Sequence, residues 1–218
     1  MTGETKPDPP PARRMRRPLS RSFAAVAFYP SLLFNWSMIH IFRRWRWWDR
    51  IDEHVLIGAL PTDKIVEEII AAGVTAVVNT CQEFAGPVGT YSKSGVEQLH
   101  LPTIDFVPPS LEDVRRGVEF IDQQVAAGKQ VYIHCKAGRA RSATIVICWL
   151  IKAKDMTPTE AQLFLKSKRR QILKSVYRRP VVEQFYQWWL NEKKRLAESA
   201  DQAAPAESES PEQPDSSE

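Results

Sequence analysis

The stretch "VYIHCKAGRARSAT", residues 131–144, joins a β-branched strand pattern, a loop of small and basic residues, and the start of an apolar helix. Small residues allow successive backbone N–H groups to turn inward and form a nest that binds an anion. The helix behind the loop adds the positive end of its dipole. The stretch therefore predicts a cup for a tetrahedral dianion. The residues expected to line it are Lys136, Ala137, Gly138, Arg139 and Ala140.

Cys135 lies at the floor of this expected cup, and Arg141 returns over it with a planar guanidinium that matches two phosphate oxygens. Helix N-termini and nearby cations lower a cysteine pKa from about 8.5 to roughly 3.5–7.5, so we expect a thiolate at pH 7. That thiolate is placed to attack a bound phosphorus atom while Arg141 stabilises the transition state. Ser142 is placed to hydrogen-bond the departing thiolate, and His134 to orient the loop.

The leaving alkoxide needs a proton, and "PTIDFVPPS", residues 102–110, provides the candidate acid. Asp105 follows an expected strand and precedes a turn with two prolines. Asp155 and Asp113 are poorer candidates, because Asp155 lies beyond the far end of the helix after the loop and Asp113 fits another helix's first turn. We expect no metal or other cofactor, since no Asp, His and Glu cluster suggests a catalytic metal.

Strand and helix patterns alternate from about Asp49 onward. We expect strands at residues 55–60, 74–80, 96–101 and 130–134. Helices are expected after Thr62, after Ser110, from near Ser142, after the Thr157 capping box and over residues 180–196. Cys148 is expected to be a plain core residue. The alternation predicts an α/β fold with a mainly parallel central sheet and helices on both faces.

Charge is unevenly distributed along the 218 residues. Seven of the 26 acidic residues lie in the tail, residues 197–218, which has no Lys or Arg and is expected to be disordered. Residues 1–196 therefore hold 19 acidic residues against all 30 Lys and Arg residues, a formal charge of +11. Such a body favours an anionic partner such as a membrane or a phosphorylated substrate.

Two N-terminal segments precede the expected domain at residues 49–196. Residues 1–21 are rich in Arg and poor in acids, as in a mitochondrial transit segment. In residues 22–48, an uncharged run of about the length that crosses a bilayer, roughly 20 residues, leads into a Trp and Arg cluster suited to a membrane interface. We predict membrane association; whether the run spans the bilayer or packs on the domain stays open.

The chain has three cysteines, which form no disulfide framework or metal motif and suit a reducing compartment. A low-pKa Cys135 oxidises readily, and Cys81 is a candidate to resolve it as a disulfide. This redox control is a side hypothesis.

The loop resembles the signature loop of the cysteine-dependent, dual-specificity-like phosphatases, and most of all that of the mitochondrial protein-tyrosine-phosphatase-like phosphatidylglycerophosphatases. "FYPSLLF", "IDEHVLIGALP", "GVEQLHLPTID" and "YRRP" are similar to that family's segments in the same order, so the likeness covers residues 26–183. The resemblance implies Cys135 as nucleophile, Arg141 as phosphate clamp and Asp105 as general acid. It also implies a matrix-facing inner-membrane enzyme that converts phosphatidylglycerophosphate to phosphatidylglycerol in cardiolipin synthesis.

Two positions depart from that family's pattern. Ala140 stands where Ser is usual, a change between small residues that we expect to be harmless. "QEFAGP", residues 82–87, stands where a Glu-Glu-Tyr-like loop is usual. That loop shapes the pocket mouth in the family, so the resemblance fixes the chemistry more firmly than the substrate.

The basic residues indicate the partners. Lys136 and Arg139 add more positive charge than one phosphate monoester needs, which suits a lipid headgroup with a second phosphate or an inositol polyphosphate. Seven cations in residues 166–180 suit an anionic membrane surface, or else form a solvated helix face. We expect an anionic phospholipid substrate and the inner-membrane surface as partners, and no nucleic acid. A phosphoprotein or phosphoinositide phosphatase, and a non-catalytic phospholipid-binding module, are the alternatives.

Overall fold

The computed structural model describes residues 30, 33, 36–38 and 45–203. The predicted transit-like segment, most of the uncharged run and the end of the acidic tail lie outside these residues. Within the described part of the chain, no helix is both long enough and apolar enough to cross a membrane.

In the described residues, a single sheet has the strand order β1-β2-β5-β3-β4. β1 (Trp48–Arg50) runs antiparallel to β2 (Val55–Gly58). The other neighbours are parallel: β2 with β5 (Gln130–His134), β5 with β3 (Val74–Cys81), and β3 with β4 (Glu97–Thr103). The predicted α/β fold with a mainly parallel sheet is therefore confirmed, and all four expected strands are present.

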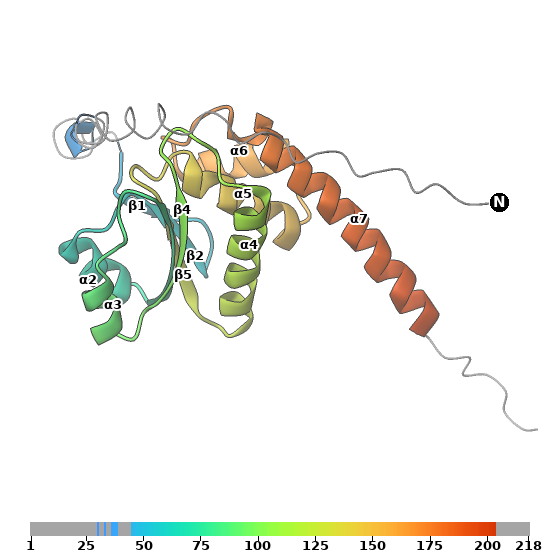
Figure 1. The fold of residues 1–218 in the computed structure, drawn as a ribbon, viewed down its shortest axis with the longest axis horizontal. Coiled ribbons are helices and arrows are strands. Elements are labelled where there is room, and N and C mark those ends of the chain that lie inside the picture. The colour runs from blue at the N-terminus through green and yellow to red at the C-terminus, as the bar shows by residue number, and fades with distance from the viewer. Residues whose placement is uncertain (1–29, 31–32, 34–35, 39–44, 204–218) are drawn as a thin grey trace, which may run out of the picture.

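Helices cover both faces of this sheet, as predicted (Figure 1). α2 (Asp63–Ala71) and α3 (Val88–Lys93) lie on one face. The opposite face carries α4 (Leu111–Ala126), α5 (Arg141–Ala153), α6 (Pro158–Lys168), the short 3₁₀ helix η1 (Val176–Arg178) and α7 (Pro180–Ala203). The sequence analysis missed β1, α3 and η1, because segments this short carry too little periodicity to be recognised.

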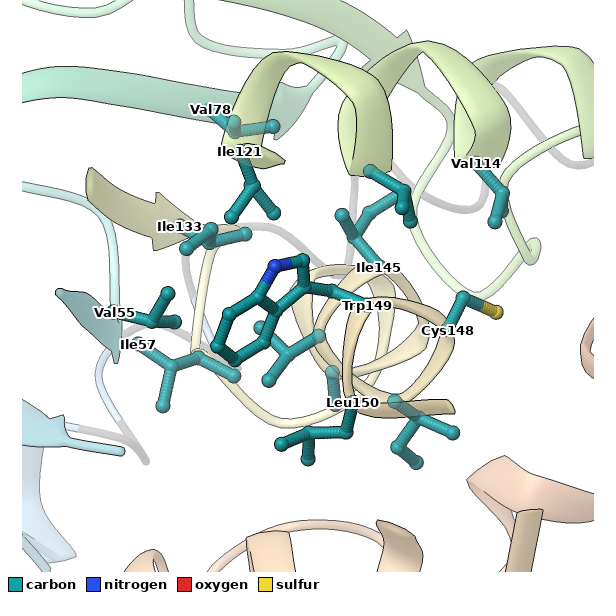
Figure 2. Packing of buried hydrophobic residues seen from close by; sticks show 14 of the residues in the cluster. Val55, Ile57, Val78, Val114, Ile121, Ile133, Ile145, Cys148, Trp149 and Leu150 are labelled. Atoms are coloured by element: carbon teal, nitrogen blue, oxygen red, sulfur yellow. The ribbon is translucent and has the colours of Figure 1, made fainter. Parts of the chain in front are cut away.

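Successive strand residues point to opposite faces, which gives the protein two apolar clusters. Ile57 and Ile133 pack toward α4 and α5, whereas Leu56 and Tyr132 pack toward α2 and α3. Figure 2 shows side chains of α5, among them the Trp149 indole, pointing into the first cluster. Cys148 is 0% exposed there, so its predicted place in the core is confirmed.

The helix ends follow the expected capping chemistry. The Ser110 hydroxyl accepts a hydrogen bond from the Asp113 N–H at 3.1 Å, and Thr157 forms the predicted capping box with Glu160. α7 differs from expectation, because it continues past residue 196 to Ala203. The first part of the predicted disordered tail is therefore helical. Residues 192–203 are rich in helix-forming Ala, Glu, Lys and Arg, and spaced ion pairs support them.

The last aromatic residues of the N-terminal segment belong to the folded domain. Trp47 and Trp48 pack against the second apolar cluster, and the Trp47 indole N–H donates to the Leu60 carbonyl at 3.0 Å.

Next to these two tryptophans, Arg169 is 0% exposed and forms an ion pair with Asp49 at 2.6 Å. Arg169 therefore faces inward, which corrects our assignment of every cation in residues 166–180 to a membrane surface or a solvated face.

Replacing Arg169 with Met is expected to destabilise the fold, because it leaves the buried Asp49 carboxylate with only the exposed Arg46 side chain, 3.6 Å away, as a partner. Breaking a buried pair in this way lowers the free energy of unfolding by about 3–5 kcal/mol. The exposed neighbour Arg170 provides a matched control. Arg170→Met should change the free energy of unfolding by less than about 0.5 kcal/mol. Urea unfolding monitored by circular dichroism measures both variants. If Arg169→Met and Arg170→Met unfold with the same free energy, the ion pair of Arg169 with Asp49 contributes nothing to stability.

Candidate active site

Three parallel strands end at one edge of the sheet, and a residue of chemical interest follows each. Glu83 follows β3, Asp105 follows β4 and Cys135 follows β5. Ligands bind at the carboxyl ends of strands in sheets of this kind. A cavity of about 280 Å³ lies at this edge. Its lining contains these residues predicted from the sequence: Asp105, Cys135, Lys136, Ala137, Arg139, Ala140 and Arg141.

The loop after β5 wraps around the Cys135 sulfur. The Gly138 N–H donates to Sγ at 3.2 Å, and the Ser142 hydroxyl donates to Sγ at 3.4 Å. Gly138 has φ 62°, and a Cβ atom there would lie 2.3 Å from the Gly58 carbonyl oxygen. Both the backbone conformation and the lack of space therefore require glycine at this position.

The surroundings of Cys135 favour its charged form. Burial alone raises the pKa of the thiol, but the positive charge of Arg141 and hydrogen bonds from Ser142 and from the Arg139 N–H lower it to about 7. This pKa lies at the upper end of the range expected from the sequence. A large fraction of Cys135 is therefore a thiolate at neutral pH.

Arg169 holds the loop from its outer side. Its Nε donates to the Gly138 carbonyl at 2.8 Å, and a terminal nitrogen donates to the Ala137 carbonyl at 3.3 Å. Binding these carbonyl oxygens outside the loop leaves the neighbouring N–H groups directed inward, as an anion nest requires. No local pattern in the sequence marks Arg169 for this position, because it lies within a run of cations.

Arg141 is only 2% exposed, and its guanidinium is held by several acceptors. It donates to both Glu83 carboxylate oxygens at 2.7 and 2.9 Å and to the Thr103 carbonyl at 2.8 Å. Glu83 therefore positions Arg141, a role that the sequence analysis missed. The signal available was an acidic residue two positions after the buried strand β3, within the segment that the sequence analysis noted only as a departure from the family pattern.

Asp105 reaches the same group of side chains. Its carboxylate lies 3.0 Å from an Arg141 nitrogen and also forms an ion pair with Lys136. Lys136 is 4% exposed, so its charge is directed at Asp105 in this structure. Phe106 follows Asp105 at the cavity wall with φ 65°, a left-handed conformation that is uncommon outside glycine.

Two further residues named from the sequence lie beside the loop. Burial lowers the pKa of His134 to about 3, so its ring is neutral at pH 7 and stacks on Tyr132 at 5.6 Å. Cys81 is buried with a free thiol, and burial raises its pKa. Within the described residues, no cluster of three or more His, Cys, Asp or Glu side chains is arranged to hold a metal ion.

Fold and loop together define a cysteine-dependent phosphatase. The family model described as "Dual specificity phosphatase, catalytic domain" matches residues 56–188, so the chain belongs to the dual specificity phosphatases. More particularly, its relatives place it among the phosphatidylglycerophosphate phosphatases of the PTPMT type.

The phosphatidylglycerophosphate phosphatase PTPMT2 of Arabidopsis thaliana is 39% identical over 175 residues, which cover 79% of this chain and 77% of the relative. Phosphatidylglycerophosphatase and protein-tyrosine phosphatase 1 of Mus musculus is 38% identical over 66% of this chain and 79% of its own. The crystal structure of PTPMT1 in complex with PI(5)P aligns with a TM-score of 0.62 and 33% identity, over 69% of this chain and 99% of that one.

The rate of Cys135 alkylation is expected to rise with pH and to reach half of its maximum near pH 7. Only the thiolate reacts, and the pKa of the Cys135 thiol is about 7. Iodoacetamide labelling over a pH series, read by mass spectrometry of the Cys135 peptide, measures this midpoint. Ser142→Ala removes a hydrogen bond to the sulfur and should raise the midpoint. A wild-type midpoint near about 8.5, the value of an ordinary thiol, would contradict the activated thiolate.

Proposed function

We propose that this protein hydrolyses phosphatidylglycerophosphate to phosphatidylglycerol and inorganic phosphate through a cysteinyl-phosphate intermediate. The observation that supports it is the Cys135 thiolate, enclosed by its loop at a cavity that also contains Arg141 and Asp105. The substrate is taken from relatives that are named phosphatidylglycerophosphate phosphatases and resemble this chain over most of its length.

In the first step, Cys135 Sγ attacks the phosphorus atom of the terminal monoester while the bond from phosphorus to the glycerol oxygen breaks. Loop N–H groups and the Arg141 guanidinium hold the equatorial phosphate oxygens and stabilise their charge in the transition state. Protonated Asp105 gives its proton to the leaving alkoxide. Phosphatidylglycerol departs, and the phosphoryl group remains on sulfur.

In the second step, water attacks the phosphorus atom and the bond to sulfur breaks. Asp105, now a carboxylate, accepts a proton from that water. The Ser142 hydroxyl, 3.4 Å from Sγ, hydrogen-bonds the departing thiolate and stabilises its charge. Inorganic phosphate leaves, and Cys135 returns to its starting form.

Substrate binding and the placement of the acid are coupled in this proposal. In the structure, the Asp105 carboxylate forms ion pairs with Arg141 and Lys136. A bound phosphate dianion would use the same N–H donors. An entering phosphoryl group takes over the Arg141 nitrogen and releases Asp105 toward the leaving oxygen. Glu83 keeps its two hydrogen bonds to Arg141 and preserves the orientation of the guanidinium.

We further propose that the enzyme acts at the matrix side of the mitochondrial inner membrane, in cardiolipin synthesis. Support comes from the Arg-rich start of the chain and from the uncharged run that follows it. An anionic phospholipid surface is the partner that these segments fit, together with the exposed cations Lys168, Arg170, Lys174 and Arg178.

A phosphoinositide is the second candidate substrate. The observation in its favour is the related PTPMT1 crystal structure in complex with PI(5)P. A phosphoprotein is the third, because mouse and human relatives also carry the name protein-tyrosine phosphatase. Rates on phosphatidylglycerophosphate vesicles, phosphoinositide vesicles and phosphotyrosine peptides, measured side by side, distinguish the three.

Wild-type protein should release inorganic phosphate from phosphatidylglycerophosphate vesicles in the presence of a chelator. Cys135→Ser should lose turnover while it still binds inorganic phosphate, because the hydroxyl is a far weaker nucleophile but the loop is unchanged. Malachite-green phosphate release and isothermal titration with phosphate measure the two properties. Turnover by Cys135→Ser equal to that of wild type would contradict every catalytic mechanism through this sulfur.

Asp105→Asn should slow hydrolysis most for substrates with poor leaving groups. General acid catalysis raises the rate by about 10²–10⁴-fold where an alkoxide departs, but it raises the rate little where the leaving group is a stable phenolate. Steady-state rates on an alkyl phosphate and on p-nitrophenyl phosphate measure the difference. If the substitution slows both substrates equally, the proton donor is not Asp105.

A further inference from the structure

Two arginines at the cavity have no carboxylate partner among the described residues. Arg139 and Arg179 both line the cavity that contains Cys135, and both are half-buried. The other cations near the loop are paired, Arg141 with Glu83, Lys136 with Asp105 and Arg169 with Asp49. Positive charge at this wall of the cavity is therefore left uncompensated within the described part of the chain.

Neutral groups hold both guanidinium groups in place. Arg139 donates to the Gln171 carbonyl at 3.0 Å and lies 4.6 Å from the centre of the Trp45 ring. Arg179 donates to the Ala140 carbonyl at 3.2 Å and to the Thr144 hydroxyl at 2.8 Å. These contacts fix the two side chains without neutralising them, as in a preformed anion site.

The position of Arg179 places this charge beside the catalytic loop. Its partner Ala140 directly precedes Arg141, so a second anion bound here would lie next to a phosphoryl group held over Cys135. Burial lowers the pKa of both Arg139 and Arg179, and the Cys135 thiolate opposes that change. Both cations are thus partly desolvated, which strengthens their attraction for an anion.

We propose that Arg139 and Arg179 form a second anion subsite, which binds the phosphodiester of the substrate while its terminal monoester occupies the catalytic loop. The identity of that substrate rests on the proposed function. Phosphatidylglycerophosphate carries the two phosphates on one glycerol bridge, which fits two adjacent anion sites. The sequence suggested Lys136 and Arg139 for this purpose. We assign Arg179 in place of Lys136, because Lys136 is paired with Asp105 and Arg179 has no carboxylate partner in the described residues.

The cavity wall supports a lipid headgroup at these two sites. Leu173 lies on the wall with Arg139 and Arg179 and is 38% exposed, and its N–H donates to the Arg139 carbonyl at 3.1 Å. Phe106 also lies on the wall and is 62% exposed. Apolar side chains beside cationic ones suit a molecule that joins phosphate groups to carbon chains.

The test compares two water-soluble substrates that release phosphate from the same type of primary alkoxide. One is the deacylated headgroup of phosphatidylglycerophosphate, which keeps the diester; the other is glycerol 3-phosphate, which lacks it. The measured quantity is kcat/KM for the diester headgroup divided by kcat/KM for glycerol 3-phosphate. Replacing Arg179 with Gln should lower this ratio by about tenfold or more, because a hydrogen bond to a charged group is lost only with the diester substrate. Arg139→Gln should lower the ratio in the same direction.

Arg178→Gln is the matched control, since Arg178 is the exposed neighbour and does not line the cavity. It should leave the ratio at the wild-type value. Both substrates meet the same folded fraction of enzyme, so partial unfolding of Arg179→Gln would lower both rates and not their ratio. A ratio unchanged in both Arg179→Gln and Arg139→Gln would overturn the subsite.

Vesicle assays separate this inference from the proposed function. If wild type hydrolyses phosphatidylglycerophosphate but the ratio does not respond to either substitution, the subsite is wrong and the proposed function stands. If wild type fails on these vesicles but still prefers the diester headgroup, and loses that preference in Arg179→Gln, the subsite stands and the lipid is another one. Neither probe contains acyl chains, so a membrane surface cannot produce the ratio.

Discussion

A sulfur anion buried at the carboxyl edge of a parallel sheet is the constraint on which the rest of the site depends. Burial opposes the charge on Cys135, so the protein must supply compensation at close range. It does so with the cation of Arg141 and with backbone N–H groups of the loop. Gly138 is required for the loop to turn this tightly against the Gly58 carbonyl. Fold and chemistry are thus joined at the sulfur.

The cations around this anion differ in what compensates them, and that difference assigns their roles. Arg141 pairs with two carboxylates, and in the proposed mechanism an entering phosphoryl group takes the place of one of them, Asp105. A cation that faces away from the cavity and pairs with a buried carboxylate mainly fixes structure. Arg169, paired with Asp49, therefore acts on the backbone of the loop. A cation held only by neutral acceptors keeps its attraction for an anion. In the described residues, Arg139 and Arg179 at the cavity are of this second kind.

Sequence reasoning succeeded where the information is local. The strand, small-residue loop and helix around Cys135 lie within a short stretch, and the caps at Ser110 and Thr157 depend on residues three positions away. It missed two roles that depend on distant contacts, those of Arg169 and Glu83. Arg169 reaches Asp49 across 120 positions, and Arg141 reaches Glu83 across 58. An arginine in a basic run gives no sign that it will be buried, because only the fold brings its partner to it.

The same distant contacts connect the catalytic loop to the start of the folded domain. Trp45 lies against Arg139, the Arg46 carbonyl accepts from the Gln171 side chain at 2.9 Å, and the Trp47 carbonyl accepts from Arg169 at 3.3 Å. Each partner touches or lines the loop. The segment expected to associate with a membrane therefore ends beside the cavity that contains Cys135. Under the proposed function, a membrane bound by that segment would lie near the cavity, so the phosphate of a lipid substrate would reach the thiolate while its acyl chains remain in the bilayer.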